Sequence, residues 1–226
     1  ANHSSLGGYH GAKMKRYQEL IENCLSSNLA EMIGVLQNGS KDLSKFTAVN
    51  MLNAQYLKFG DQANNVLQND HAFGNAWFTE SMVSVKIPDE ELAAVCSLVS
   101  QKMTVMNAEK FKSSQSVYDA AATITLETYQ PNLLKYRVNN QNAGFAVFSE
   151  IYYPFGWQAT VDGVPTEIKQ VNYVLRGLEI PANSLEIVFE FKPAAYFIGN
   201  KITAAFSILI LFLLVFGTFK KIWNAS

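Results

Sequence analysis

The stretch "GWQATVDGVPTEIKQVNYVLRGLEIPANSLEIVFEFK", residues 156–192, decides the fold class of this chain. Apolar and polar residues alternate in it over short runs, which is the period of a β-strand with one buried face. The pair Asp162-Gly163 separates two of these runs and predicts a two-residue hairpin turn. In the last run the alternate, same-face positions are apolar: Leu185, Ile187, Phe189 and Phe191. The stretch therefore predicts antiparallel strands joined by tight turns.

The same alternation extends back to about residue 103 through "AATITLETYQ", "NLLKYRVNN" and "GFAVFSEIYY". Six or seven short strands at this spacing predict an antiparallel β-sandwich or a jelly-roll-like domain over residues 103–193.

Upstream, residues 1–102 predict a mixed α/β part, so the fold class is α+β. Apolar residues at helical spacing predict helices over residues 12–25, over residues 29–36 and after Pro88. "AWFTESMVSVKI", residues 76–87, predicts one strand, and the polar run 61–75 predicts a loop.

A transmembrane helix is predicted near the C-terminus, within residues 198–223. "ITAAFSILILFLLVFGTF", residues 202–219, has no charge and no proline, and it approaches the roughly 20 residues that span a bilayer. The alternative is a buried core helix, but such a helix is seldom apolar on every face. Lys220 and Lys221 after the span favour a cytoplasmic location for that end. Residues 1–13 contain no apolar signal segment, so an export signal is expected upstream and the chain is expected to be part of a longer polytopic protein.

The composition argues against several classes of function. The net charge of -1 gives no reason to expect nucleic acid as a partner. The sequence has no nucleophile elbow, phosphate-binding loop, zinc-protease helix or CxxC pair, so we predict no catalytic residue, no metal site and no cofactor within it. Cys24 and Cys96 are either two buried free thiols, which is the simpler interpretation, or one disulfide formed in an oxidising compartment.

The opening run "GGYHGAKMKRYQEL", residues 7–20, is a candidate anion site. Glycines before a helix allow close backbone approach, and the helix start offers free N–H groups. The side chains that would hold a phosphate there are Tyr9, His10, Lys13 and Arg16. The alternative is an ordinary helix whose basic side chains face solvent.

Aromatic residues near one acid and one arginine form a second candidate, a glycan-binding surface. Aromatic rings can stack on sugar rings while charged groups bind hydroxyls. The residues are Glu150, Tyr152, Tyr153, Trp157, Tyr173 and Arg176. The alternative is that the aromatic rings pack in the sheet and that Glu150 pairs with Arg176.

Several segments, in order along the chain, resemble the C-terminal region of the YfhO family of bacterial polytopic membrane proteins. They are "GGYHGAKMKRYQELIE", "MLNAQYLKFGD", "GNAWF", "YQPNLLKYRV", "AVFSEIYYPFGWQATVDGVPTEIKQVNYVLRGLEIPA" and "FEFKP", followed by one hydrophobic span. The likeness is densest over residues 146–182.

The resemblance implies a part of a C-type membrane glycosyltransferase, an enzyme class that transfers a sugar from a polyprenyl-phosphate carrier to cell-envelope glycans. It implies that residues 1–195 lie outside the cytoplasmic membrane of a bacterium, and that the catalytic acid lies upstream of this chain. The expected partners are the lipid bilayer, the polyprenyl-phosphate sugar donor and a glycan acceptor; the metal requirement of the parent enzyme is left open. The alternative function is a non-catalytic, membrane-anchored glycan-binding or scaffold domain.

Overall fold

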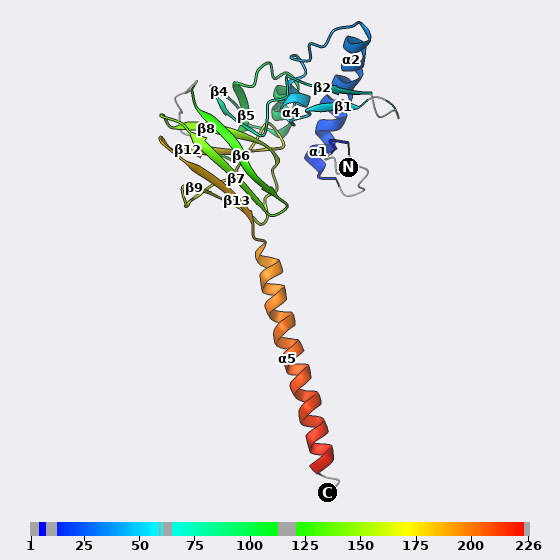
Figure 1. Ribbon diagram of the computed structural model, residues 1–226, viewed down its shortest axis with the longest axis vertical. Helices are drawn as coiled ribbons and strands as arrows, with labels where there is room; N and C mark the ends of the chain where they lie inside the picture. Colours follow the sequence, from blue (N-terminus) through cyan, green and yellow to red (C-terminus); the bar gives the residue numbers. More distant parts are fainter. Residues whose placement is uncertain (1–4, 8–12, 59, 61–64, 113–120, 224–226) are drawn as a thin grey trace.

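The computed structural model of the chain describes residues 5–7, 13–58, 60, 65–112 and 121–223. It has three layers, namely a set of helices, a six-stranded sheet and a five-stranded sheet, and a long C-terminal helix leaves the head (Figure 1). This arrangement confirms the α+β fold class, with a β-sandwich and one C-terminal apolar helix.

The five-stranded sheet is antiparallel throughout. In spatial order its strands are β10 (Val164–Thr166), β9 (Trp157–Val161), β13 (Glu186–Phe191), β7 (Leu133–Asn139) and β6 (Thr123–Gln130). Between β9 and β10, Asp162 and Gly163 have φ angles of 50° and 79°, as the predicted hairpin turn requires. The predicted same-face register holds for Ile187 and Phe189, which are fully buried. It is wrong for Leu185, which lies before the strand and is 72% exposed.

The six-stranded sheet is mixed. Its strands in order are β3 (Ala76–Thr79), β8 (Gly144–Ile151), β12 (Leu175–Ile180), β11 (Lys169–Val171), β5 (Met103–Asn107) and β4 (Ser81–Val85). All neighbours are antiparallel except β4 and β5, which are parallel and are joined by helix α4 (Pro88–Cys96). The predicted domain boundary at residue 103 would separate β3 and β4 from the other strands of this sheet. The boundary stays a prediction.

The six-stranded sheet is covered on both faces, and its strand β8 accordingly begins with an uninterrupted apolar and fully buried run, residues 144–148. Along β8, Phe145 and Val147 face the core beneath the helices, while Ala146 and Phe148 face the core between the two sheets. Short side chains let these layers approach. A Cβ added to Gly177 on β12 would lie 2.6 Å from the ring of Phe145, so the packing there depends on glycine.

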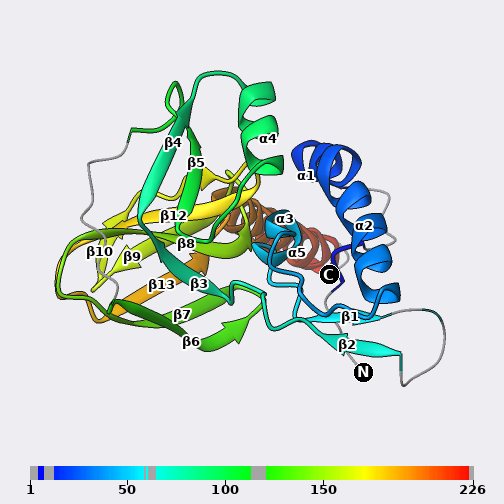
Figure 2. The same cartoon turned by 90° about the horizontal axis from the view of Figure 1, so that it is seen from above.

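The helical layer differs from the predicted pair of helices. One continuous run comprises α1 (Lys15–Leu20), a π-helical turn (Ile21–Leu25) and α2 (Ser26–Gln37). The prediction of a break before residue 29 is wrong, because Ser26 and Ser27 lie within the helix. Their hydroxyls donate to the carbonyls of Ile21 and Cys24, one turn back. A short helix α3 (Thr47–Asn50) completes the layer, which Figure 2 shows beside the sheets.

Two strand predictions also need correction. Residues 76–87 form two strands, β3 and β4, because the chain breaks at Glu80 and passes from one edge of the six-stranded sheet to the other. Residues 61–75, predicted as loop, contain β2 (Val66–Gln68), which pairs with β1 (Tyr56–Lys58). Three residues are too few for the alternation of a strand to be recognisable.

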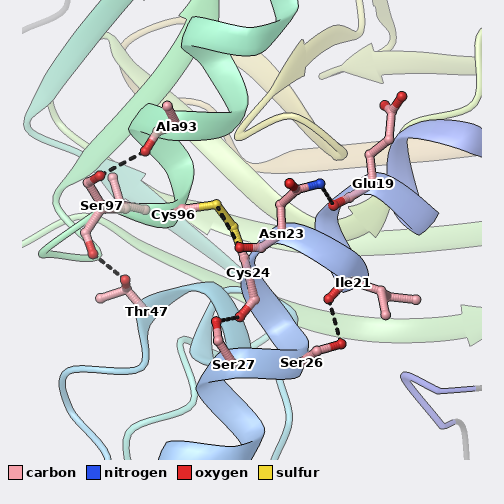
Figure 3. The surroundings of a disulfide bond; sticks show 11 residues. Glu19, Ile21, Asn23, Cys24, Ser26, Ser27, Thr47, Ala93, Cys96 and Ser97 are labelled. Atoms are coloured by element: carbon pink, nitrogen blue, oxygen red, sulfur yellow. Dashed lines mark hydrogen bonds between the residues drawn. A yellow bond between two sulfur atoms is a disulfide. The ribbon is translucent and has the colours of Figure 1, made fainter.

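Cys24 and Cys96 form a disulfide, with their Cα atoms 5.4 Å apart (Figure 3). The free-thiol interpretation is therefore wrong, and the alternative holds. The bond joins the π-helical turn to the last residue of α4, two segments that sequence spacing alone does not bring together. Thr47 lies beside this junction and donates its hydroxyl to the carbonyl of Leu98.

Helix α5 (Ala194–Trp223) follows β13 after only Lys192 and Pro193. From Ala194 to Val215 every residue is exposed, and the helix is long and apolar enough to cross a membrane. The alternative of a buried core helix is therefore wrong, because α5 extends away from the head along this length (Figure 1).

Candidate functional site

The end of the sandwich next to α5 carries most of the predicted glycan-binding residues. Trp157 begins β9 and pairs with Phe191, the last residue of β13, so both lie at the end from which the chain enters α5 (Figure 1). Arg176 lies near the start of β12, opposite the end of β8 that carries Glu150. Antiparallel pairing thus brings together residues that are far apart in the sequence.

Arg176 is the centre of this cluster. It is 3% exposed, and its guanidinium carbon lies 4.1 Å from the ring centroid of Trp157 and 5.5 Å from that of Phe189. Its Nε donates to the carbonyl of Ile151 at 3.2 Å. Its Nη1 is buried without a hydrogen-bond partner among the described residues. Burial lowers the pKa of Arg176, and the charge of Glu150 opposes that shift.

Glu150 shares this environment without a direct ion pair to Arg176 in the described part of the chain. Burial raises the pKa of its carboxyl group, and the positive charge of Arg176 only partly offsets the shift. The predicted alternative, a simple Glu150–Arg176 pair, is thus replaced by two charged groups that interact at longer range.

Two tyrosines that were not among the predicted site residues complete the cluster. Tyr136 is fully buried, with its ring packed edge-on against Phe148 and Phe189, and its hydroxyl has no partner in the described region. Tyr129 is 63% exposed, and the charge of Glu150 raises the pKa of its hydroxyl. No local motif marks either residue; only the alternation along β6 and β7 could have indicated that they share an end of the sheet.

An open groove of about 590 Å³ runs beside the cluster. Tyr152, Tyr153 and Trp157 line one part of it, and Thr160, Thr166 and Glu167 line another. Trp157 therefore belongs both to the Arg176 cluster and to the groove, since its ring covers Arg176 and also forms part of the groove wall. Polar groups beside aromatic rings in a groove of this size could bind a sugar.

Tyr173 does not belong to this cluster. It is 3% exposed and has a φ of 67°, an uncommon conformation for a bulky residue. Its backbone N–H donates to Glu91 at 3.2 Å, its hydroxyl donates to Glu19 at 2.6 Å, and its ring lies 4.4 Å from the Arg16 guanidinium carbon. The turn between β11 and β12 is thereby tied to the helical layer.

The candidate anion site is only partly described. Tyr9 and His10 lie outside the described residues. Lys13 is exposed, whereas Arg16 donates from Nη1 to Glu91 at 2.9 Å and to the carbonyl of Tyr173 at 3.1 Å. The positive charge of Arg16 thus already has a buried carboxylate as its partner. No pattern in the sequence indicates this partner, because only the packing of α4 on α1 creates the contact.

No cluster of three or more histidine, cysteine, aspartate or glutamate side chains that could hold a metal ion occurs in the described ranges.

Residues 94–203 match the family model described as bacterial membrane protein YfhO. The matched region contains strands β5 to β13, the candidate cluster and the start of α5. Residues 94–203 belong to the YfhO family. No curated protein and no solved structure matches it.

Proposed function

We propose that this YfhO-family chain is the extracytoplasmic domain and last membrane span of a glycosyltransferase that transfers sugar from a polyprenyl-phosphate carrier to a cell-envelope glycan. In this proposal the chain binds the glycan acceptor at the α5 end of the sandwich, and catalytic groups lie elsewhere in the parent protein. The observation that carries the binding role is the Trp157 ring, which lies over buried Arg176 and also lines the groove.

The disulfide supports the proposed location. Disulfides persist in oxidising compartments and are rare in the reducing cytoplasm. A chain whose helical layer is joined by Cys24–Cys96 fits the outer side of the cytoplasmic membrane. Lys220 and Lys221 after the span fit the cytoplasmic side.

Donor binding is the second part of the proposal. Because Arg16 is paired with Glu91, the donor phosphate would depend on Lys13 together with the proposed Tyr9 and His10. Lys15 is a matched control, since it is also exposed, lies two residues away and contacts Glu19 at 3.6 Å. In the intact parent protein, Lys13→Ala should raise the KM for a polyprenyl-phosphate sugar and Lys15→Ala should not. Equal effects of the two would remove Lys13 from the donor site.

Acceptor binding is tested with the full chain in nanodiscs and an array of bacterial envelope glycans. Trp157→Phe keeps an aromatic ring against Arg176 but reduces the groove wall, so the affinity should fall a few-fold to about tenfold while the fold survives. Tyr56→Ala is the control, because Tyr56 is an exposed aromatic on β1 that does not line the groove. If Trp157→Phe binds every glycan as the unaltered chain does, the groove is not the acceptor site.

The second candidate function is a non-catalytic glycan-binding or scaffold domain, since the same groove would serve it. The two are separated by adding polyprenyl phosphate to the same assay. Binding of the lipid phosphate that weakens with salt and with Lys13→Ala favours the transferase part. Glycan binding without any affinity for the lipid phosphate favours the scaffold.

A further inference from the structure

The loop between β8 and β9, residues 152–156, exposes two aromatic side chains beside the start of α5. We call this segment the aromatic loop. Phe155 is 68% exposed and Tyr153 is 43% exposed, with their rings edge-on at 5.6 Å. Large apolar groups exposed together on a soluble surface usually mark a binding surface.

The aromatic loop is fixed to the chain that enters α5. The N–H of Lys192 donates to the carbonyl of Gly156 at 2.6 Å. Gly156 has a φ of 93°, and a Cβ added there would lie 2.8 Å from the Phe191 ring and 3.1 Å from the Cα of Pro193. The aromatic loop is therefore packed directly against the start of α5, with no room for a side chain at position 156.

The length of α5 places this contact near the membrane surface. The charge-free run of α5, residues 202–219, begins after Lys201 and is about 27 Å long at 1.5 Å per residue, close to the ~30 Å hydrocarbon core. Ala194 begins the two helical turns that precede this run and therefore lies at the level of the lipid headgroups. Pro193, which Gly156 contacts, directly precedes it.

The exposed side chains at this level have the chemistry of a membrane interface. Tyr196 and Phe197, in the first turn of α5, are 65% and 50% exposed, with rings 5.6 Å apart. They and the aromatic loop form two pairs of aromatic rings at the junction of head and helix. Aromatic rings are enriched at the headgroup level, where one end can be apolar and the other hydrated.

We propose that the aromatic loop inserts Tyr153 and Phe155 into the headgroup layer of the same bilayer that α5 crosses. The head is then held to the membrane at two points, α5 and the loop, rather than swinging on one helix. The Trp157 groove is lined by the same loop, so it opens at the membrane surface, where a lipid-linked substrate is located. The proposal depends on α5 crossing the bilayer, but not on glycan binding.

The test places an added tryptophan at Phe155 in the full chain, reconstituted in phosphatidylethanolamine and phosphatidylglycerol nanodiscs. The lipids carry either a nitroxide on the headgroup or bromine on the acyl chain, and the signal of the added indole is the difference from the unaltered chain. Leu185→Trp is the matched control. Leu185 is 72% exposed and precedes β13, the strand whose other end meets α5, so it lies at the far end of the sandwich.

With headgroup nitroxide, we expect the indole from Phe155→Trp to lose about half of its emission and the indole from Leu185→Trp to keep nearly all of it. Equal emission from the two would overturn the proposal. Phe206→Trp, within α5, should be quenched by the brominated acyl chains; if it is not, α5 does not lie in the bilayer and the proposal falls. A loss of glycan binding by Phe155→Ser without any quenching at Phe155→Trp would assign the loop to the glycan instead.

Discussion

The guanidinium of Arg16, on α1, donates a 2.9 Å hydrogen bond to the carboxylate of Glu91, on α4. The Glu91 side chain is 1% exposed and that of Arg16 is 19% exposed, so the pair is largely removed from water. The same carboxylate accepts from the backbone N–H of Tyr173. One buried charge thus joins the first helix, α4 and the turn of the six-stranded sheet.

Replacing Arg16 should destabilise the head. Arg16→Met leaves the Glu91 carboxylate buried without its cation, which costs roughly 3 to 5 kcal/mol when a buried pair is broken. Lys15→Met removes a cation that is 89% exposed and should change stability by less than about 0.5 kcal/mol. Urea unfolding of the full chain in detergent, followed by tryptophan fluorescence, gives both values. Similar losses for the two variants would show that the pair contributes no more than a surface contact.

Reducing the Cys24–Cys96 disulfide should also destabilise the head. The two cysteines are 72 residues apart in sequence, and a loop of that length corresponds to about 4 kcal/mol of lost unfolded-state entropy in the chain-entropy model. The urea midpoint should fall when dithiothreitol is added, whereas the double variant Cys24→Ser, Cys96→Ser should be unaffected by the reductant. Alkylation of two thiols in the denatured, unreduced chain would contradict the bond.

The two cross-links join the same partners, since both tie the first helical run to α4. Interactions within one junction are not expected to add independently. The free energy lost in Arg16→Met should therefore differ between the oxidised and the reduced chain, which a double cycle measures.

Gly156→Ala tests the contact between the aromatic loop and α5, with Gly163→Ala as the control. Both glycines have positive φ angles, so both substitutions carry a backbone cost of about 1 to 2 kcal/mol. A Cβ at Gly163 meets nothing within 4 Å, while a Cβ at Gly156 meets Phe191 and Pro193. Gly156→Ala should therefore cost about 1 to 3 kcal/mol more, as overpacking does. Equal urea midpoints for the two variants would mean that the aromatic loop moves aside and accommodates the added methyl group without cost.

Local sequence patterns predict those parts of the fold that a single segment of the chain specifies by itself. The alternation along residues 186–191, the Asp162-Gly163 turn and the uniformly apolar span can each be recognised from one stretch of sequence. The disulfide, the Arg16–Glu91 pair and the parallel β4–β5 contact each depend on two segments meeting in space. Nothing in either segment alone specifies its partner.

The residues predicted to bind a glycan do not all lie together in the structure, for the same reason. Glu150 and Arg176 lie on neighbouring antiparallel strands of the six-stranded sheet. Trp157 belongs to the five-stranded sheet, and the packing of the two sheets places its ring against Arg176.

Tyr173 and Arg176 lie at the same end of the β11–β12 pair, but the Tyr173 ring packs against Arg16 of the helical layer. The Arg176 guanidinium instead lies against Trp157 and Phe189, on the side of the five-stranded sheet. The two side chains lie on opposite faces of the sheet, so proximity along the chain indicated the wrong neighbour there.

Glu150 provides a test of the cluster through pH. Its pKa in the folded chain is raised above the ordinary value of 4.5, chiefly by burial, so the folded state binds the proton more tightly than the unfolded state. The stabilisation from the protonated carboxyl is therefore complete below about pH 4.5 and is lost as pH rises through the folded pKa. Glu150→Gln, which resembles the protonated form, should be more stable than the unaltered chain at neutral pH and equal to it in acid, below the ordinary carboxyl pKa.

Asp162→Asn is the control with the opposite sign. Backbone N–H groups of Glu186 and Leu185 donate to the Asp162 carboxylate and lower its pKa below 3.8, so its contribution is present at neutral pH and is lost as pH falls through the folded value. Asp162→Asn should therefore weaken the fold at neutral pH, and the difference should shrink in acid. If Glu150→Gln also weakens the fold at neutral pH, the attraction between Glu150 and Arg176 outweighs the cost of burial. The cluster would then be held together mainly by that charge interaction, and an uncharged residue at position 150 would leave Arg176 without its counter-charge.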